Sequence, residues 1–185
     1  MCIRDRPVSI PELPPIPLDP GYEIIGVGHR LHRTGLTHDL ESYLPRINPD
    51  MEEQLVRHLL DKVKKDAKKI IKYETYRNPE DAEVVVVCYG SESRSVKAAI
   101  KLAAKKKMNV AMVRLITAWP FPKDFFQKLD QKNRVFVVAE INAGQMRLEV
   151  ERYIKRGNVE GLNLMGGRIH TPAEVLGAVG NYIRR

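Results

Sequence analysis

Residues 134–146 read RVFVVAEINAGQM, and this stretch decides the fold. From Val135 to Ala139 the residues are all apolar, which predicts a strand covered on both faces of a sheet. Glu140 follows at the carboxyl edge of that strand, and Asn142 and Gln145 have the spacing of a capping box at the start of a helix. Open α/β sheets place ligands and partner contacts at such junctions, although capping alone would also explain Asn142 and Gln145.

The same alternation continues on both sides of this stretch. Thr171, Pro172 and Glu174 fit the N-cap, N1 and N3 positions of a last helix. The other apolar runs and helical periods predict strands at 83–89, 109–115 and 161–165, and helices at 94–106, shortly after Pro122 and through 146–154. Strands that alternate with helices through short connections predict an α/β fold with a mostly parallel three-layer sheet.

The N-terminal part has a different composition. Residues 1–49 are rich in proline and glycine and are interpreted as an irregular linker, whose first six residues we take as non-native. Asp50 and Glu53 have capping-box spacing, and apolar residues recur at helical spacing from there to about Tyr73. The predicted organisation is therefore a linker at 1–49, a connecting helix within 50–79 and an α/β domain at 80–185.

Composition bounds the partners and the compartment. The net charge is +8, but the lysines cluster on two predicted helices, opposite apolar stripes and without interleaved aromatic residues. They are therefore interpreted as solvated faces, or as a docking surface for an acidic protein, rather than as a nucleic-acid site. Two cysteines are too few for a disulfide framework, and no segment has a secretory or membrane-spanning pattern. We expect a cytoplasmic protein that binds neither nucleic acid nor membrane.

No complete catalytic or metal-binding constellation is found in the sequence. His29, His32 and His38 are closely spaced, but they alternate with arginines that would repel a metal ion. The segment Gly90-Ser91-Glu92-Ser93 has the position of an anion-binding loop, yet Glu92 argues against phosphate. His170 has no evident acid or nucleophile partner in the sequence. We therefore predict no catalytic residue and no metal ligand.

Four segments occur in an order that resembles a known family. They are 34–39 (TGLTHD), 115–122 (LITAWPFP), 139–146 (AEINAGQM) and 167–174 (GRIHTPAE). From Pro7 to its end the chain resembles the C-terminal portion of the alpha subunit of 2-oxoacid:ferredoxin oxidoreductases, and the 2-oxoglutarate synthase type most of all. The resemblance implies a fold like that of the transketolase C-terminal domain.

The resemblance also implies a role. A complete enzyme of this family decarboxylates a 2-oxoacid oxidatively with coenzyme A, thiamine diphosphate, Mg²⁺ and iron–sulfur clusters, and ferredoxin accepts the electrons. By this resemblance the chain alone binds none of these cofactors and is inactive, and it serves to assemble and orient the complex with a beta subunit and any further subunits. Six residues are the expected contacts to neighbouring domains or subunits: Glu140, Asn142, Gln145, Trp119, Arg168 and His38.

Three alternatives stay open. One is a stand-alone doubly wound module that binds an anionic small molecule at the Gly90 loop or at Gly167-Arg168. A second is a pure interaction protein that uses its basic helices on an acidic partner. The third is a subunit of the same family that acts on a branched-chain 2-oxoacid or on pyruvate.

Overall fold

The computed structural model describes residues 35–37 and 47–183. The chain divides into two compact units, residues 1–57 and 58–185, and the second contains a five-stranded sheet of order β1-β3-β2-β4-β5. Four strands are mutually parallel, and β1 pairs antiparallel with β3. The strands are β1 (Tyr73–Tyr76), β2 (Val84–Tyr89), β3 (Val110–Leu115), β4 (Val135–Glu140) and β5 (Asn158–Asn163). The predicted α/β class with a mostly parallel sheet is confirmed.

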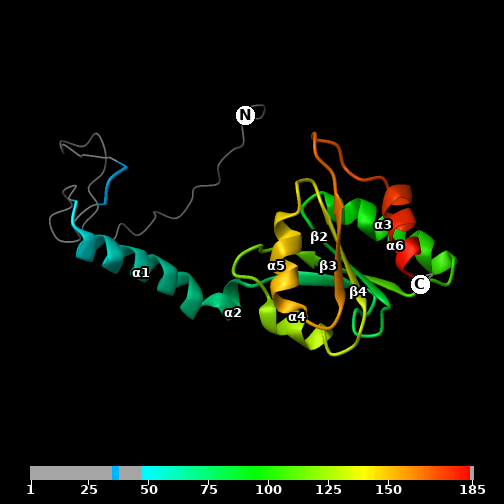
Figure 1. Ribbon diagram of the computed structural model, residues 1–185, viewed down its shortest axis with the longest axis horizontal. Helices are drawn as coiled ribbons and strands as arrows, with labels where there is room; N and C mark the ends of the chain where they lie inside the picture. The colour runs from blue at the N-terminus through cyan, green and yellow to red at the C-terminus, as the bar shows by residue number, and fades with distance from the viewer. Residues whose placement is uncertain (1–34, 38–46, 184–185) are drawn as a thin grey trace, which may run out of the picture. The chain divides into compact units, whose positions relative to one another are not determined.

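Helices cover both faces of the sheet (Figure 1). On one face, α3 (Glu92–Lys105) and α6 (Pro172–Ile183) pack on side chains such as Val86 and Val137. On the other, α4 (Lys123–Leu129) and α5 (Gln145–Tyr153) pack on Val87 and Phe136. The central strands are therefore buried on both sides, which is why their sequences run continuously apolar instead of alternating.

The predicted helix from Asp50 to about Tyr73 is interrupted at Asp66 and ends at Ile70, three residues earlier than expected. The structure has α1 (Pro49–Lys65), a single turn α2 (Ala67–Ile70) and then the edge strand β1. All four β1 residues lie at the surface or are half-buried, so the sequence carries no apolar strand pattern there. What creates β1 is hydrogen bonding to β3, about forty residues away, together with the cross-strand ion pair between Glu74 and Arg114 at 3.0 Å.

The start of α1 also differs from the prediction. The side chain of Asn48, rather than that of Asp50, accepts hydrogen bonds from the helix, from the backbone N–H of Asp50 at 3.0 Å and of Met51 at 3.4 Å. Pro49 then takes the first helical position, where its fixed φ and missing N–H cost nothing. Glu53 pairs instead with Arg57, one turn further on.

The last strand begins three residues earlier than expected, at Asn158. The turn before it is held by Asp130, whose carboxylate accepts hydrogen bonds from the backbone N–H of Lys155, Arg156 and Gly157 at 2.7 to 3.1 Å. Burial by itself would raise the pKa of Asp130, but these three donors outweigh burial and hold the pKa below its usual value. Asp130 thus has a structural role at the amino end of the sheet.

None of the helices within the described residues has both the length and the apolar character required to cross a bilayer.

Candidate functional site

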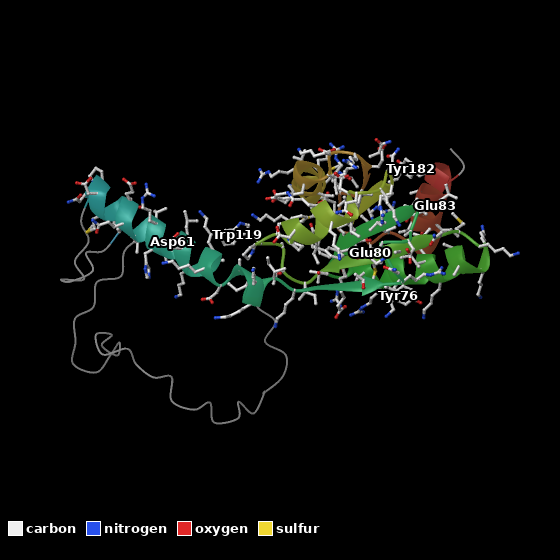
Figure 2. All side chains as sticks on the ribbon, turned by 90° about the horizontal axis from the view of Figure 1, so that it is seen from below. Asp61, Tyr76, Glu80, Glu83, Trp119 and Tyr182 are labelled. Carbon is white, nitrogen blue, oxygen red and sulfur yellow. The ribbon has the colours of Figure 1, made fainter. Side chains whose placement is uncertain are left out.

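The candidate site is the carboxyl edge of the parallel strands. The neighbouring strands β2 and β4 send the chain to opposite faces there, since β2 leads into α3 and β4 leads into α5. Such a reversal is where open α/β sheets place ligands and contacts. Figure 2 shows Trp119, which follows β3, at this end of the domain, and Glu83, which precedes β2, at the opposite end.

Glu140, the last residue of β4, is completely buried at this edge. Its Oε2 accepts a hydrogen bond from the backbone N–H of Met146 at 2.9 Å, and its Oε1 accepts one from that of Arg147 at 3.0 Å. These donors belong to the first turn of α5, which has no intrahelical acceptors for them. The carboxylate therefore caps α5 and compensates the positive end of its dipole.

Asn142 closes the loop between Glu140 and α5. Its Oδ1 accepts hydrogen bonds from the backbone N–H of Gly144 at 2.8 Å and of Gln145 at 3.2 Å. Gly144 is the N-cap residue with φ +107°, and an added Cβ would lie 2.9 Å from the side chain of Asn163, so only glycine fits there. Asn142 therefore helps to cap this helix, as predicted, but Gly144 is the N-cap residue, and Glu140 rather than the side chain of Gln145 supplies the second capping group.

Tyr89 at the end of β2 joins this network. The side-chain amide of Asn142 donates a hydrogen bond of 2.6 Å to the Tyr89 hydroxyl. Burial and then the nearby negative charge of Glu140 raise the pKa of Tyr89, and the hydrogen bond from Asn142 partly opposes them. The phenol therefore stays neutral at physiological pH.

A second buried pair links two loops on the other side of the edge. Glu92, at the start of α3, is 2% exposed, and His170, just before α6, is 3% exposed. The backbone N–H of His170 donates to Glu92 Oε1 at 3.1 Å, and His170 Nδ1 lies 3.1 Å from Glu92 Oε2. Glu92 is thus the acid that the sequence did not reveal for His170, and it connects residues 78 positions apart.

Arg168 lies in the same loop as His170 but points to solvent. Its guanidinium pairs with Glu174 at 2.9 Å, and Glu174 also accepts a 2.7 Å hydrogen bond from the backbone N–H of Thr171. The hydroxyl of Thr171 in turn accepts from the backbone N–H of Glu174 at 3.2 Å, so the predicted capping box is confirmed. The Thr171 N–H first and then Arg168 lower the pKa of Glu174 to about 2.

Trp119 is a large exposed aromatic side chain at this edge, with 56% of its surface accessible. It follows β3 and precedes the cis bond to Pro120. Two residues on, Phe121 is buried and stacks on Tyr153 of α5 at 5.2 Å between ring centroids. The loop is therefore fixed by Phe121 while Trp119 is left available for contact.

The six residues predicted as contacts lie in different settings. Glu140, Asn142 and Gln145 come together at the start of α5, Trp119 and Arg168 lie on separate loops of the same edge, and His38 lies outside the described residues. Their role as contacts stays a prediction. Tyr89 and Glu92 were missed as members of the site, because their partners are far away in the sequence.

The chemistry of this edge is unfavourable for anions. Glu92 stands at the first position of α3, Glu140 caps α5 and Glu174 caps α6. A phosphate would have to occupy helix N-termini that already carry the chain's own carboxylates. The edge therefore does not support the alternative of an anion-binding module.

Metal and cluster chemistry is not supported within the described residues either. No group of three or more histidine, cysteine or carboxylate side chains there is placed to hold a metal ion. Cys88 in β2 is completely buried, and burial raises the pKa of its thiol to about 12, so it is not a ready thiolate ligand. Magnesium and iron–sulfur clusters do not fit this part of the chain.

The fold and this edge define a class of protein. Residues 82–175, which run from just before β2 to the first turn of α6, match the pyruvate:ferredoxin oxidoreductase core domain II family. The chain therefore belongs to that family, and the resemblance to a 2-oxoacid:ferredoxin oxidoreductase subunit is confirmed.

Two curated relatives and one solved structure give the particulars. The chain is 41% identical to the 2-oxoglutarate synthase subunit KorA of Methanocaldococcus jannaschii, over 95% of the chain and 48% of the relative. It is 33% identical to the ketoisovalerate oxidoreductase subunit VorB of Methanothermobacter thermautotrophicus, over 69% of the chain and 36% of the relative. The chain thus spans about half the length of the first relative and about a third of the second.

The solved structure is the 2-oxoglutarate:ferredoxin oxidoreductase from Magnetococcus marinus with 2-oxoglutarate, coenzyme A and succinyl-CoA bound. The match has a TM-score of 0.67 and 22% identity, and it covers 86% of this chain and 28% of that one. At this identity the likeness concerns the fold alone.

Proposed function

We propose that this chain is the domain II portion of the alpha subunit of a 2-oxoglutarate:ferredoxin oxidoreductase. The complete enzyme would convert 2-oxoglutarate, coenzyme A and oxidised ferredoxin into succinyl-CoA, CO₂ and reduced ferredoxin. The observation that carries the proposal is the family match over 82–175, together with the 41% identity to a 2-oxoglutarate synthase subunit. The VorB relative makes a branched-chain 2-oxoacid the second candidate substrate.

Within that enzyme the chain has an orienting role. Its edge carboxylates Glu92 and Glu140 are buried and accept backbone N–H groups of the chain, so they are not exposed to a substrate. Trp119, Gln145 and Arg168 are exposed at the same edge, as expected for contacts to a neighbouring domain. Thiamine diphosphate, magnesium and the clusters would be held by other parts of the complex.

The partners in this proposal are a beta subunit, any further subunits and ferredoxin as the electron acceptor. The cytoplasmic location stays a prediction from composition.

The proposal is tested with the longer subunit that contains this chain, co-expressed with the other subunits encoded with it. The purified complex should reduce ferredoxin with 2-oxoglutarate and coenzyme A much faster than with pyruvate or 2-oxoisovalerate, and the 185-residue chain alone should be inactive. Faster turnover of 2-oxoisovalerate would shift the substrate to the branched-chain class. A complex with no 2-oxoacid activity would contradict the proposal.

The contact role of the edge is tested separately by Trp119→Ala in the same complex. Truncation of a tryptophan that is a hot spot of an interface costs about 2 kcal/mol or more, which corresponds to a roughly 30-fold weaker association. The thermal stability of the isolated chain should not change, because Trp119 is exposed in it. Leu102→Ala, an exposed position on α3, is the control. Equal assembly of both variants would refute the contact role of Trp119.

A further inference from the structure

A groove runs along α6 on the layer that it shares with α3. Its volume is about 580 Å³, and it is lined by Lys106, Met108 and one face of α6. Figure 2 shows Tyr182, near the end of α6, at the same end of the domain as Glu83, where the strands begin. The groove thus extends towards the end of the domain opposite the edge described above.

The α6 side of the groove combines small and aliphatic residues, with polar groups at its border. The side of α6 that faces it carries Ala173, Leu176, Gly177, Gly180 and Ile183. Gly177 and Gly180 lie inside the helix with helical backbone, so no positive φ requires glycine at either position.

Packing inside the chain does not require these glycines either. A Cβ added at Gly177 would meet nothing within 4 Å, and one at Gly180 would meet only the end of Met108, at an ordinary 3.8 Å. Glycine inside a helix is less stable than alanine, so the two glycines weaken α6 with no benefit to the fold of this chain. Close approach of another backbone to α6 would explain them.

The rim of the groove is basic. Lys106 is in the lining, and Lys105 and Lys107 beside it are exposed. In the described part of the chain, no carboxylate is within ion-pair distance of these three lysines. Asn181 is the other polar residue of the lining, and no acidic residue contributes to it.

We propose that this groove binds an amphipathic helix with acidic residues along one border, contributed by another subunit of the complex. The apolar side of that helix would lie on the glycine face of α6, and its acidic residues would pair with the lysines at the end of α3. The occupant is a protein segment and not a nucleic acid, because the α6 side of the groove combines small and aliphatic residues and no aromatic side chain of the lining could stack on bases. This proposal extends the proposed function and rests on it.

The first test is site-specific photo-crosslinking in the purified complex. A benzophenone amino acid at Asn181 should crosslink to an acidic, amphipathic peptide of a different subunit, identified by mass spectrometry. The same residue at Lys123, on the opposite layer, is the control and should not capture that peptide. A crosslink to a second copy of this chain, to a peptide without acidic residues, or no crosslink would overturn the proposal.

The second test separates docking from folding. Gly177→Ala should raise the melting temperature of the isolated chain by about 2 to 4 °C, because alanine favours the helix and its Cβ has room. Gly177→Leu fills the groove and should weaken subunit association at least tenfold without lowering that temperature. Lys106→Glu should weaken association similarly and more strongly at low salt, whereas Lys123→Glu makes the same charge change elsewhere and should have little effect.

Unchanged association in both Gly177→Leu and Lys106→Glu would overturn the groove as a docking site. If the subunits do not assemble even with the unaltered chain, it is the proposed function that fails. The failure of the groove proposal can therefore be told apart from the failure of the proposed function.

Discussion

Replacing Glu140 is the most direct test of how the edge is built. Glu140→Ala removes a completely buried carboxylate and leaves two backbone N–H groups of the first turn of α5 without acceptors. Glu140→Gln keeps the shape and one acceptor oxygen, but it turns an amide NH₂ towards the other donor. The two variants separate the loss of both acceptors from the loss of the charge and one acceptor.

The expected magnitude follows from the two contacts. A hydrogen bond to a charged group contributes about 1.5 to 3 kcal/mol, and the variant no longer has to bury a charge, which offsets part of the loss. We therefore expect Glu140→Ala to lower the free energy of unfolding by about 3 kcal/mol and Glu140→Gln by about 1 to 2 kcal/mol. Glu151→Gln, on the same helix, removes only an exposed pair with Arg147 and should cost less than about 0.5 kcal/mol.

The assay is urea unfolding of the chain, followed by circular dichroism. A loss of about 3 kcal/mol moves the unfolding midpoint by roughly 1 to 3 M urea. A second readout is the pKa of Tyr89, followed by NMR of ¹³C-labelled tyrosine. It should fall in Glu140→Gln, because the negative charge that helps to raise it is gone.

The reasoning is refuted if Glu140→Ala and Glu151→Gln have equal stability within about 0.5 kcal/mol, which is the spread of ordinary surface substitutions. An unchanged pKa of Tyr89 in Glu140→Gln would show that the charge of Glu140 does not reach the phenol.

Three further predictions concern the same domain. Glu92→Ala should lower the unfolding free energy by about 2 kcal/mol, measured by urea unfolding, since the buried backbone N–H of His170 would lose its acceptor; a change below about 0.5 kcal/mol would contradict this role of Glu92. The pKa of Asp130 is lowered in the folded state, so its contribution to stability is present above about pH 4 and is lost as the pH falls below that value; Asp130→Asn should flatten the stability curve in that range. Coenzyme A or phosphate at about 1 mM should leave the melting temperature of the isolated chain unchanged, and a rise would revive the anion-binding alternative.

The class of fold could be predicted from the sequence because its signals are local. Val84–Cys88 and Val135–Ala139 are apolar without interruption, and this pattern belongs to strands buried on both faces. Thr171, Pro172 and Glu174 fix the start of α6 within four residues of chain, and the structure has the expected hydrogen bonds. Apolar runs and helix caps involve only residues that are close together in the chain, so they can be recognised from the sequence alone.

The edge strand and the details of the site could not be predicted in this way. β1 has no apolar pattern and exists because β3 offers it a hydrogen-bonding partner. Glu140 could be placed at the carboxyl edge, but nothing in the sequence indicated that its side chain would turn inward and cap α5.

The sequence by itself thus determined the alternation of strands and helices from β2 onward, the α/β class and, through its motifs, the family. Only the tertiary structure decided the partners of the buried charges: Glu92 meets His170 across 78 residues, and Asp130 meets the turn before β5. The physical reason is that a buried carboxylate must be compensated by whichever donors the packed chain brings to it. Those donors are backbone N–H groups, which every residue except proline has and no sequence pattern marks.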